Sequence, residues 1–181
     1  MKRKVIQIAE STQLVSLPRK WALANNIRRG DELEVTVQRK TWKEFVFCGF
    51  GEPTERLDLL LELTRWIKKR RGYILIRVNT NGHGYLLNAG RDVATELKVA
   101  GVDKVSVSLN ADNEETYNEI CKPSSKDAFA SVLEFVKKAM QVLDVEVTAV
   151  TTPEVELRKV EALTNQLGVK FRLRQFIPCF W

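Results

Sequence analysis

Cysteine and histidine are scarce in this 181-residue sequence, which has three cysteines and one histidine. The cysteines, Cys48, Cys121 and Cys179, are too far apart for a disulfide framework or a metal site built from neighbouring residues. No apolar run approaches the roughly 18–20 residues that cross a bilayer. The basic start is not followed by the apolar stretch and cleavage site of a secretory signal. We therefore expect a cytoplasmic protein that does not associate with membranes.

The composition is that of a folded chain. Hydrophobic residues make up 44% of the sequence and charged residues 29%, which is enough apolar material for a core. The length suits one ordinary domain or two small ones.

Positive charge is concentrated at one end of the chain. Residues 1–43 contain ten Lys/Arg and four Asp/Glu, whereas the other 138 residues contain 19 of each, so the whole net charge of +6 lies in the first quarter. A local basic excess is typical of a segment that binds a polyanion. A solvated basic face without a partner is the alternative that charge alone leaves open.

The basic segment has the pattern of a small β-rich domain over residues 1–40. Residues 4–17 alternate loosely and predict two short strands around a polar turn. Pro18 opens a short helix, because proline is tolerated in a first helical turn, and residues 32–38 alternate as a third strand. About 40 residues cannot bury a core alone, so we expect a homodimer.

The stretches STQLVSLPRKWA and IRRGDELEV resemble the AbrB/MazE/SpoVT swapped-hairpin DNA-binding domains. Members of that family dimerise through interlaced hairpins and present basic residues to duplex DNA. The resemblance assigns this role to Lys2, Arg3, Lys4, Arg19, Lys20, Arg28 and Arg29. Phosphate contacts from such residues imply salt-dependent binding with little base specificity.

From residue 44 onward, apolar strands alternate with amphipathic helices. Strands are expected at 44–50, 73–78, 103–109, 144–150 and 169–176, and helices at 53–71, 91–100, 113–121, 126–142 and 154–167. This alternation indicates a parallel sheet built from βα units. We therefore predict an α/β protein in which the β-rich domain precedes a truncated parallel (βα) partial barrel of about five strands, over residues 44–181.

Polar residues recur just after these strands, where parallel βα folds bind ligands. They lie in the segments 49–53, 79–84, 106–110 and 151–153. Ordinary turn and capping chemistry is the alternative for any one of these loops.

The stretches FCGFGEPTERLD, NTNGHGYLLNAGRDV, VSVSLNADNEETYNEICKP and GVKFRLRQF, within residues 44–176, resemble the radical S-adenosylmethionine superfamily, and within it the group associated with TatD-type nucleases. The resemblance implies that Gly51, Glu52 and Pro53 meet the amino group of S-adenosylmethionine. It places Asn79, Ser108 and Asn110 near the ribose and carboxylate of that cofactor, and the final strand near its adenine.

The superfamily also binds a [4Fe–4S] cluster through three cysteines in a CxxxCxxC motif, and this sequence contains no such motif. The five expected strands correspond to the second through sixth of the family, with the AbrB-like segment in place of the first strand and cluster loop. We expect no radical catalysis by this chain alone, because the cofactor carries the difficult chemistry.

Three interpretations remain open at this stage. The chain is a DNA-binding module with a core that could still bind S-adenosylmethionine; or it is a radical enzyme or subunit whose cluster ligands come from elsewhere; or it is a fusion, a truncation or an engineered junction. No nucleophile with a positioned base is readable around His83, the single histidine.

Overall fold

The computed structural model describes residues 5–7, 13–15, 23–24, 26, 43–48, 51–153 and 155–175. The chain divides into two compact units, Met1–Lys40 and Thr41–Trp181.

The first unit contains a two-stranded antiparallel sheet. Strand β1 (Val5–Gln7) pairs with β2 (Gln13–Val15), with Val5 opposite Val15 and Ile6 opposite Leu14. The two short strands predicted within residues 4–17 are therefore confirmed. Leu23 and Ala24 are helical, within the predicted short helix. The strand predicted at 32–38 and the seven basic residues assigned to DNA lie outside the described residues.

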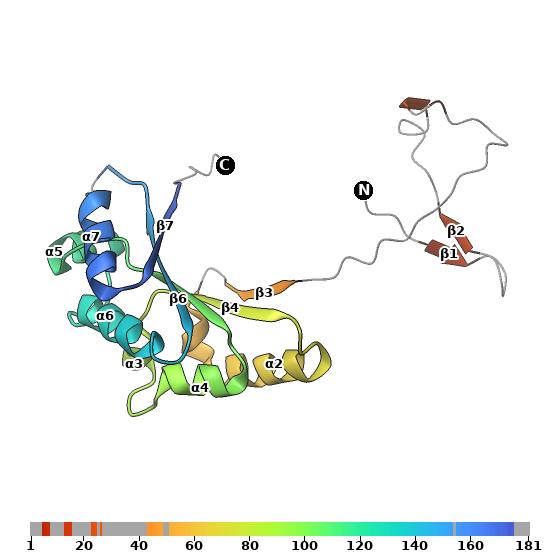
Figure 1. The fold of residues 1–181 in the computed structure, drawn as a ribbon, viewed down its shortest axis with the longest axis horizontal. Helices are drawn as coiled ribbons and strands as arrows, with labels where there is room; N and C mark the ends of the chain where they lie inside the picture. Colours follow the sequence, from red (N-terminus) through yellow and green to blue (C-terminus); the bar gives the residue numbers. More distant parts are fainter. Residues whose placement is uncertain are drawn as a thin grey trace. The chain divides into compact units, whose positions relative to one another are not determined.

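The second unit is built around a five-stranded, wholly parallel sheet (Figure 1). Its strands, in both chain and spatial order, are β3 (Glu44–Phe47), β4 (Leu75–Thr80), β5 (Lys104–Ser108), β6 (Asp144–Val150) and β7 (Lys170–Arg174). The helices between them are η1 (Pro53–Arg56), α2 (Leu57–Arg70), α3 (Gly84–Leu87), α4 (Val93–Ala100), α5 (Glu114–Cys121), α6 (Ala128–Ala139) and α7 (Leu157–Leu167). This architecture confirms the predicted α/β fold with a partial parallel barrel.

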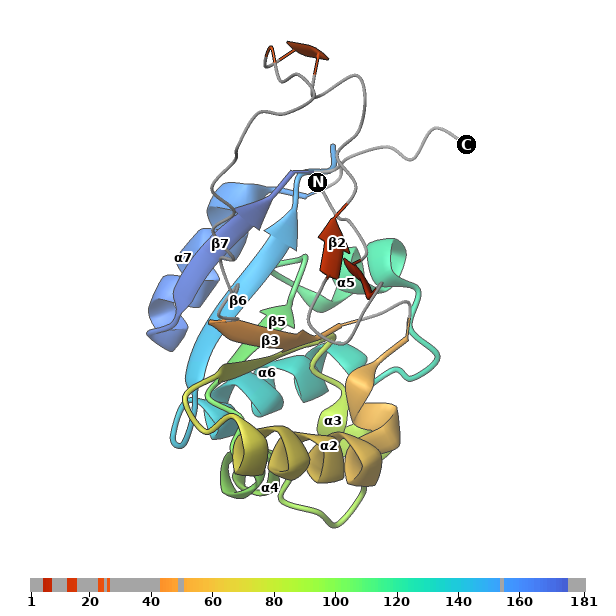
Figure 2. The same cartoon turned by 90° about the vertical axis from the view of Figure 1, so that its right-hand side faces the viewer.

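One face of this sheet is apolar and is covered by helices (Figure 2). Alternate strand residues on this face are fully buried, among them Val78, Val105 and Val147. Because successive side chains of a strand point to opposite sides, the residues between them must face the other way. The core therefore lies between the sheet and its helices, and Tyr117 and Phe135 are the largest side chains that it buries completely.

The opposite face of the sheet, which we call the inner face, carries polar and charged side chains. In register across the strands it presents Arg77, Lys104, Ser106, Asp144, Glu146, Lys170 and Arg172. A lining of this kind is typical of the inside of a barrel that holds a polar ligand rather than a packed core.

Two local details differ from the sequence-based expectations. The helix predicted from residue 53 to 71 starts as the 3₁₀ turn η1, which is followed by the α-helix α2. The short helix α3 was not predicted, because four residues are too few to show a helical period. Among the described residues, no helix is both long and apolar enough to cross a bilayer.

Candidate functional site

A cavity of about 470 Å³ lies at the carboxyl ends of the strands of the second unit. Four residues predicted from the sequence line it together: Gly51, Glu52, Asn79 and Ser108. Arg174, at the end of β7, lines the same cavity. Its size falls within the range of small-molecule sites. Residues distant in sequence therefore converge here, as parallel βα topology predicts.

Glu52 ties the loop after β3 to the loop after β4. Its carboxylate accepts hydrogen bonds from the backbone N–H and the hydroxyl of Thr54, at 3.1 and 2.8 Å. It also accepts the Thr80 hydroxyl at 2.7 Å and the Asn81 backbone N–H at 2.6 Å. Four donors of the protein thus occupy this carboxylate, so Glu52 holds the cavity wall in place.

The loop after β4 turns sharply against the core. Gly82 has a φ of +83°, and a Cβ atom there would lie 3.0 Å from Val132 Cγ1 and 3.1 Å from Val107 Cγ1. Only glycine can adopt this positive φ and also leave the space beside the two valines free, without strain. This turn leads directly to His83 and thereby sets the edge of the site.

An adjoining cavity of about 530 Å³ is lined by Asn110, another of the residues predicted to bind the cofactor, and by His83 and Tyr117. The two cavities share Glu55, Asn81 and Ser108. His83 Nε2 lies 2.9 Å from the Tyr117 hydroxyl. Burial lowers the pKa of His83, against an opposing effect of the Glu52 charge, and burial raises the pKa of Tyr117. His83 is therefore neutral at pH 7 and can accept or donate a hydrogen bond to a ligand.

Pro53 does not line either of these cavities. It lies in an apolar groove beside β3 together with Phe45, Leu59 and Leu63. Five of the six predicted cofactor residues therefore line two adjoining cavities, whereas Pro53 serves to start η1.

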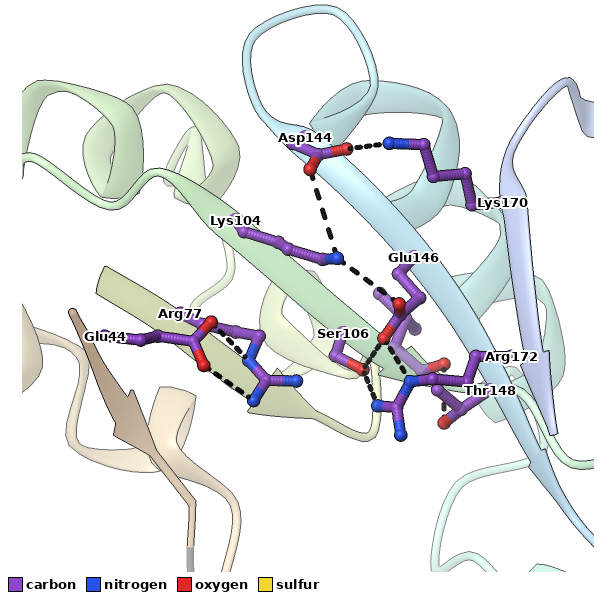
Figure 3. Close-up of polar contacts among 10 residues, drawn as sticks. Glu44, Arg77, Lys104, Ser106, Asp144, Glu146, Thr148, Lys170 and Arg172 are labelled. Carbon is purple, nitrogen blue, oxygen red and sulfur yellow. Dashed lines mark hydrogen bonds and ion pairs between the residues drawn. The ribbon is translucent and has the colours of Figure 1, made fainter. Parts of the chain in front are cut away.

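Ion pairs cross the inner face of the sheet (Figure 3). Glu146 accepts hydrogen bonds from Arg172 Nε at 2.7 Å, Ser106 Oγ at 3.2 Å and Lys104 Nζ at 3.3 Å. Burial by itself would raise the pKa of Glu146, but the hydrogen bonds from Arg172 and Lys104 outweigh it, and the pKa is lowered. The network holds β5, β6 and β7 in fixed positions beneath the cavity.

Sequence reasoning missed Arg174 and Tyr117 as site residues, and it placed Thr80 and Asn81 only within the segment 79–84 expected at the ligand-binding edge. Arg174 could have been found from the alternation of Lys170, Arg172 and Arg174 on a strand that is otherwise apolar. The others left no sequence signal beyond their place in a loop or helix, because only the tertiary fold brings them to the cavity.

The chain is similar to the Radical SAM superfamily over residues 29–167. Probable GTP 3′,8-cyclases are among its relatives. The one from Saccharolobus islandicus strain L.S.2.15 is 42% identical over 92 residues, or 51% of this chain and 27% of that protein. The one from Saccharolobus solfataricus is 40% identical over 110 residues, or 61% of this chain and 32% of that protein. The one from Thermoplasma volcanium is 27% identical over 127 residues, or 70% of this chain and 36% of that protein.

The second unit is thus an α/β partial barrel with a ligand cavity at the carboxyl ends of its strands. The chain belongs to the Radical SAM superfamily, whose members use S-adenosylmethionine and a [4Fe–4S] cluster. The matched region spans about a third of the length of these relatives.

The residues of the cavity fit S-adenosylmethionine better than they fit the cluster. Asn79 Oδ1 and Arg174 Nε are buried and have no hydrogen-bond partner among the residues that the structure describes, as expected of groups that await a polar ligand. By contrast, the described residues contain no group of three His, Cys, Asp or Glu that could hold a metal. Cys48 is exposed, and Cys121 is half-buried with a pKa raised by burial.

Proposed function

We propose that the second unit binds S-adenosylmethionine in the cavity formed by Glu52, Asn79, Ser108 and Arg174. The observation that carries this proposal is the convergence of these residues on one cavity in a member of the Radical SAM superfamily. Asn79 would accept hydrogen bonds from the ligand, and Ser108 would bind its polar groups. Glu52 would keep the two loops at the distance that the ligand requires.

The reaction we propose is radical chemistry on a purine nucleotide, with cluster ligands supplied from outside the residues described. A cluster held by ligands from elsewhere would supply the radical chemistry to S-adenosylmethionine bound beside Asn79 and Ser108. The residues of this chain would bind the cofactor and orient it in the cavity. The similarity to probable GTP 3′,8-cyclases supports this substrate class over one related to TatD-type nucleases.

Calorimetric titration of the full chain with S-adenosylmethionine tests the binding proposal. We expect saturable binding, and we expect Asn79→Ala to weaken it about five- to thirtyfold, because a buried hydrogen bond to a ligand is worth about 1–2 kcal/mol. Asn165→Ala, on the exposed surface of α7, is the matched control and should bind like the wild type. No heat with the wild type, or equal binding by both variants, would contradict the proposal.

We also propose that the first unit binds duplex DNA as a homodimer. The concentration of the entire +6 net charge in residues 1–43 favours this second function. Phosphate binding releases counterions, so affinity for a random 30-base-pair duplex should fall at least tenfold between 50 and 200 mM salt. Fluorescence anisotropy with Arg19→Gln/Lys20→Gln should show weaker binding, whereas Lys137→Gln on α6 should not. Affinity independent of salt would overturn this proposal, and a monomer in ultracentrifugation would refute the dimer.

A further inference from the structure

Arg174 differs from the other cations of the inner face in having no acidic partner among the described residues. Arg77 pairs with Glu44 at 3.0 Å, Lys170 with Asp144 at 3.6 Å, and Arg172 with Glu146 at 2.7 Å. Lys104 also pairs with Glu146, at 3.3 Å. Arg174 makes one side-chain hydrogen bond, from its NH2 group to Ser108 Oγ at 3.1 Å.

The guanidinium of Arg174 is half-buried, and within the described part of the chain its buried Nε has no hydrogen-bond partner. Burial, followed by the nearby charge of Arg172, lowers the pKa of Arg174. A half-buried cation with no acidic partner among the described residues costs free energy, and an anionic ligand that supplies the missing charge would recover part of that cost. The surroundings of Arg174 therefore favour the arrival of an anion.

The two carboxylates that line the same cavity do not supply this charge. Glu52 already accepts hydrogen bonds from Thr54, Thr80 and Asn81. Glu55 lies on the exposed side of η1, and neither carboxylate is within ion-pair distance of Arg174. The cavity thus contains one uncompensated guanidinium beside the Ser108 hydroxyl and the Asn79 amide.

We infer that Arg174 is an anion-binding residue that holds the carboxylate or phosphate oxygens of the ligand of this cavity. A guanidinium presents parallel N–H donors that match either group, and a hydroxyl beside it can add a further hydrogen bond. The anion could be the carboxylate of S-adenosylmethionine or a phosphate of a nucleotide substrate. The inference that a ligand enters this cavity rests on the function proposed above, but the need for an anion rests on Arg174 itself.

Two ligand pairs distinguish the sources of the anion. S-adenosylmethionine and its decarboxylated form differ only in the carboxylate, and GTP and guanosine differ only in the phosphates. Each is titrated calorimetrically into the full chain and into Arg174→Gln, with inorganic pyrophosphate as a fifth probe in thermal unfolding. Lys170→Gln is the matched control, because it removes one positive charge from the same strand at an exposed site paired with Asp144.

We expect Arg174→Gln to weaken binding of one anionic ligand at least tenfold while its anion-free counterpart binds as it does to the wild type. The ligand pair that shows this effect identifies the anion that Arg174 binds, either the carboxylate of S-adenosylmethionine or the phosphates of GTP. Pyrophosphate should raise the melting temperature of the wild type and of Lys170→Gln, but not that of Arg174→Gln. Arg174→Lys, which keeps the charge, should retain part of the affinity if Arg174→Gln fails to fold.

Equal binding of all ligands by the wild type and Arg174→Gln would overturn the inference, as would an equal loss in Lys170→Gln. The two proposals fail separately. If S-adenosylmethionine binds both proteins equally and neither GTP nor pyrophosphate responds to Arg174→Gln, the cofactor site stands and the role of Arg174 falls. If S-adenosylmethionine binds neither protein while GTP or pyrophosphate binding is weakened by Arg174→Gln, the role of Arg174 stands and the cofactor site falls.

Discussion

The Glu52 carboxylate lies 2.6 Å from the backbone nitrogen of Asn81, from which it accepts a hydrogen bond. This contact joins the loops after two neighbouring strands, β3 and β4, across 29 residues of sequence. Three further donors, from Thr54 and Thr80, complete the shell of this carboxylate. The cavity wall depends on a charged acceptor at this position, and a neutral amide would turn two N–H donors toward the same groups.

Glu52→Gln should therefore destabilise the protein by about 2–3 kcal/mol, because hydrogen bonds to a charged group contribute about 1.5–3 kcal/mol. Urea unfolding at pH 7 measures this loss. Glu55→Gln is the control, since Glu55 is exposed on the same 3₁₀ turn and should change stability by less than about 0.5 kcal/mol. Equal stability of the two variants would show that the hydrogen bonds of Glu52 do not stabilise the loops after β3 and β4.

Alanine substitutions at Gly82 and Gly90 distinguish the loss of stability caused by crowding from the loss caused by backbone conformation. Both have positive φ, +83° and +78°, but a Cβ at Gly82 would meet Val107 and Val132 whereas one at Gly90 would meet nothing within 4 Å. Gly90→Ala should cost about 1–2 kcal/mol from the left-handed backbone alone. Gly82→Ala should cost about 2–5 kcal/mol, because overpacking adds to that strain. Thermal unfolding of both variants measures the difference, and similar losses would contradict the close packing at Gly82.

The sequence revealed the sheet because each strand and helix shows its own period over several residues. The alternation around Val105 and Val107, and the helical repeat of Leu57, Leu60 and Leu61, are local signals. Because parallel βα folds bind ligands at the carboxyl ends of their strands, Asn79 and Ser108 could be predicted to lie in one site, and both line the same cavity. Which partner each side chain takes is a property of the tertiary fold, so the four donors around Glu52 could not be predicted.

The charged residues of the inner face also depend on the tertiary fold for their partners. Lys104, Glu146 and Arg172 lie on three separate strands, and their ion pairs depend on a register that the sequence does not state. Charged residues on a strand ordinarily indicate a solvent-exposed face. Here that face is the inside of a partial barrel. That no described acid pairs with Arg174 therefore becomes informative only once the other ion pairs are known.

Glu146→Gln should destabilise the protein at pH 7 by about 1–3 kcal/mol, less than a fully buried pair because Arg172 is partly exposed. The pKa of Glu146 is lowered in the folded state, so its contribution is present above the ordinary pKa of a glutamate and is lost as the pH falls through the folded value. The difference between wild type and variant should therefore shrink below about pH 4. Glu134→Gln, in the exposed pair with Lys138, should cost less than about 1 kcal/mol. A difference that grows on acidification would refute this assignment.

His83 should titrate below the usual 6.5, because burial disfavours its charged form more than the charge of Glu52 favours it. As the chain has a single histidine, its ring protons give an unambiguous NMR titration. A lowered pKa means that the unfolded chain binds the proton more readily, so the contribution of His83 to stability is present above pH 6.5 and declines as the pH falls through the folded value. Glu52→Gln removes the raising effect and should lower the midpoint further, whereas Glu55→Gln should leave it within about 0.2 units of the wild type. A midpoint at or above that of the urea-unfolded chain would contradict the burial of His83 beside Tyr117.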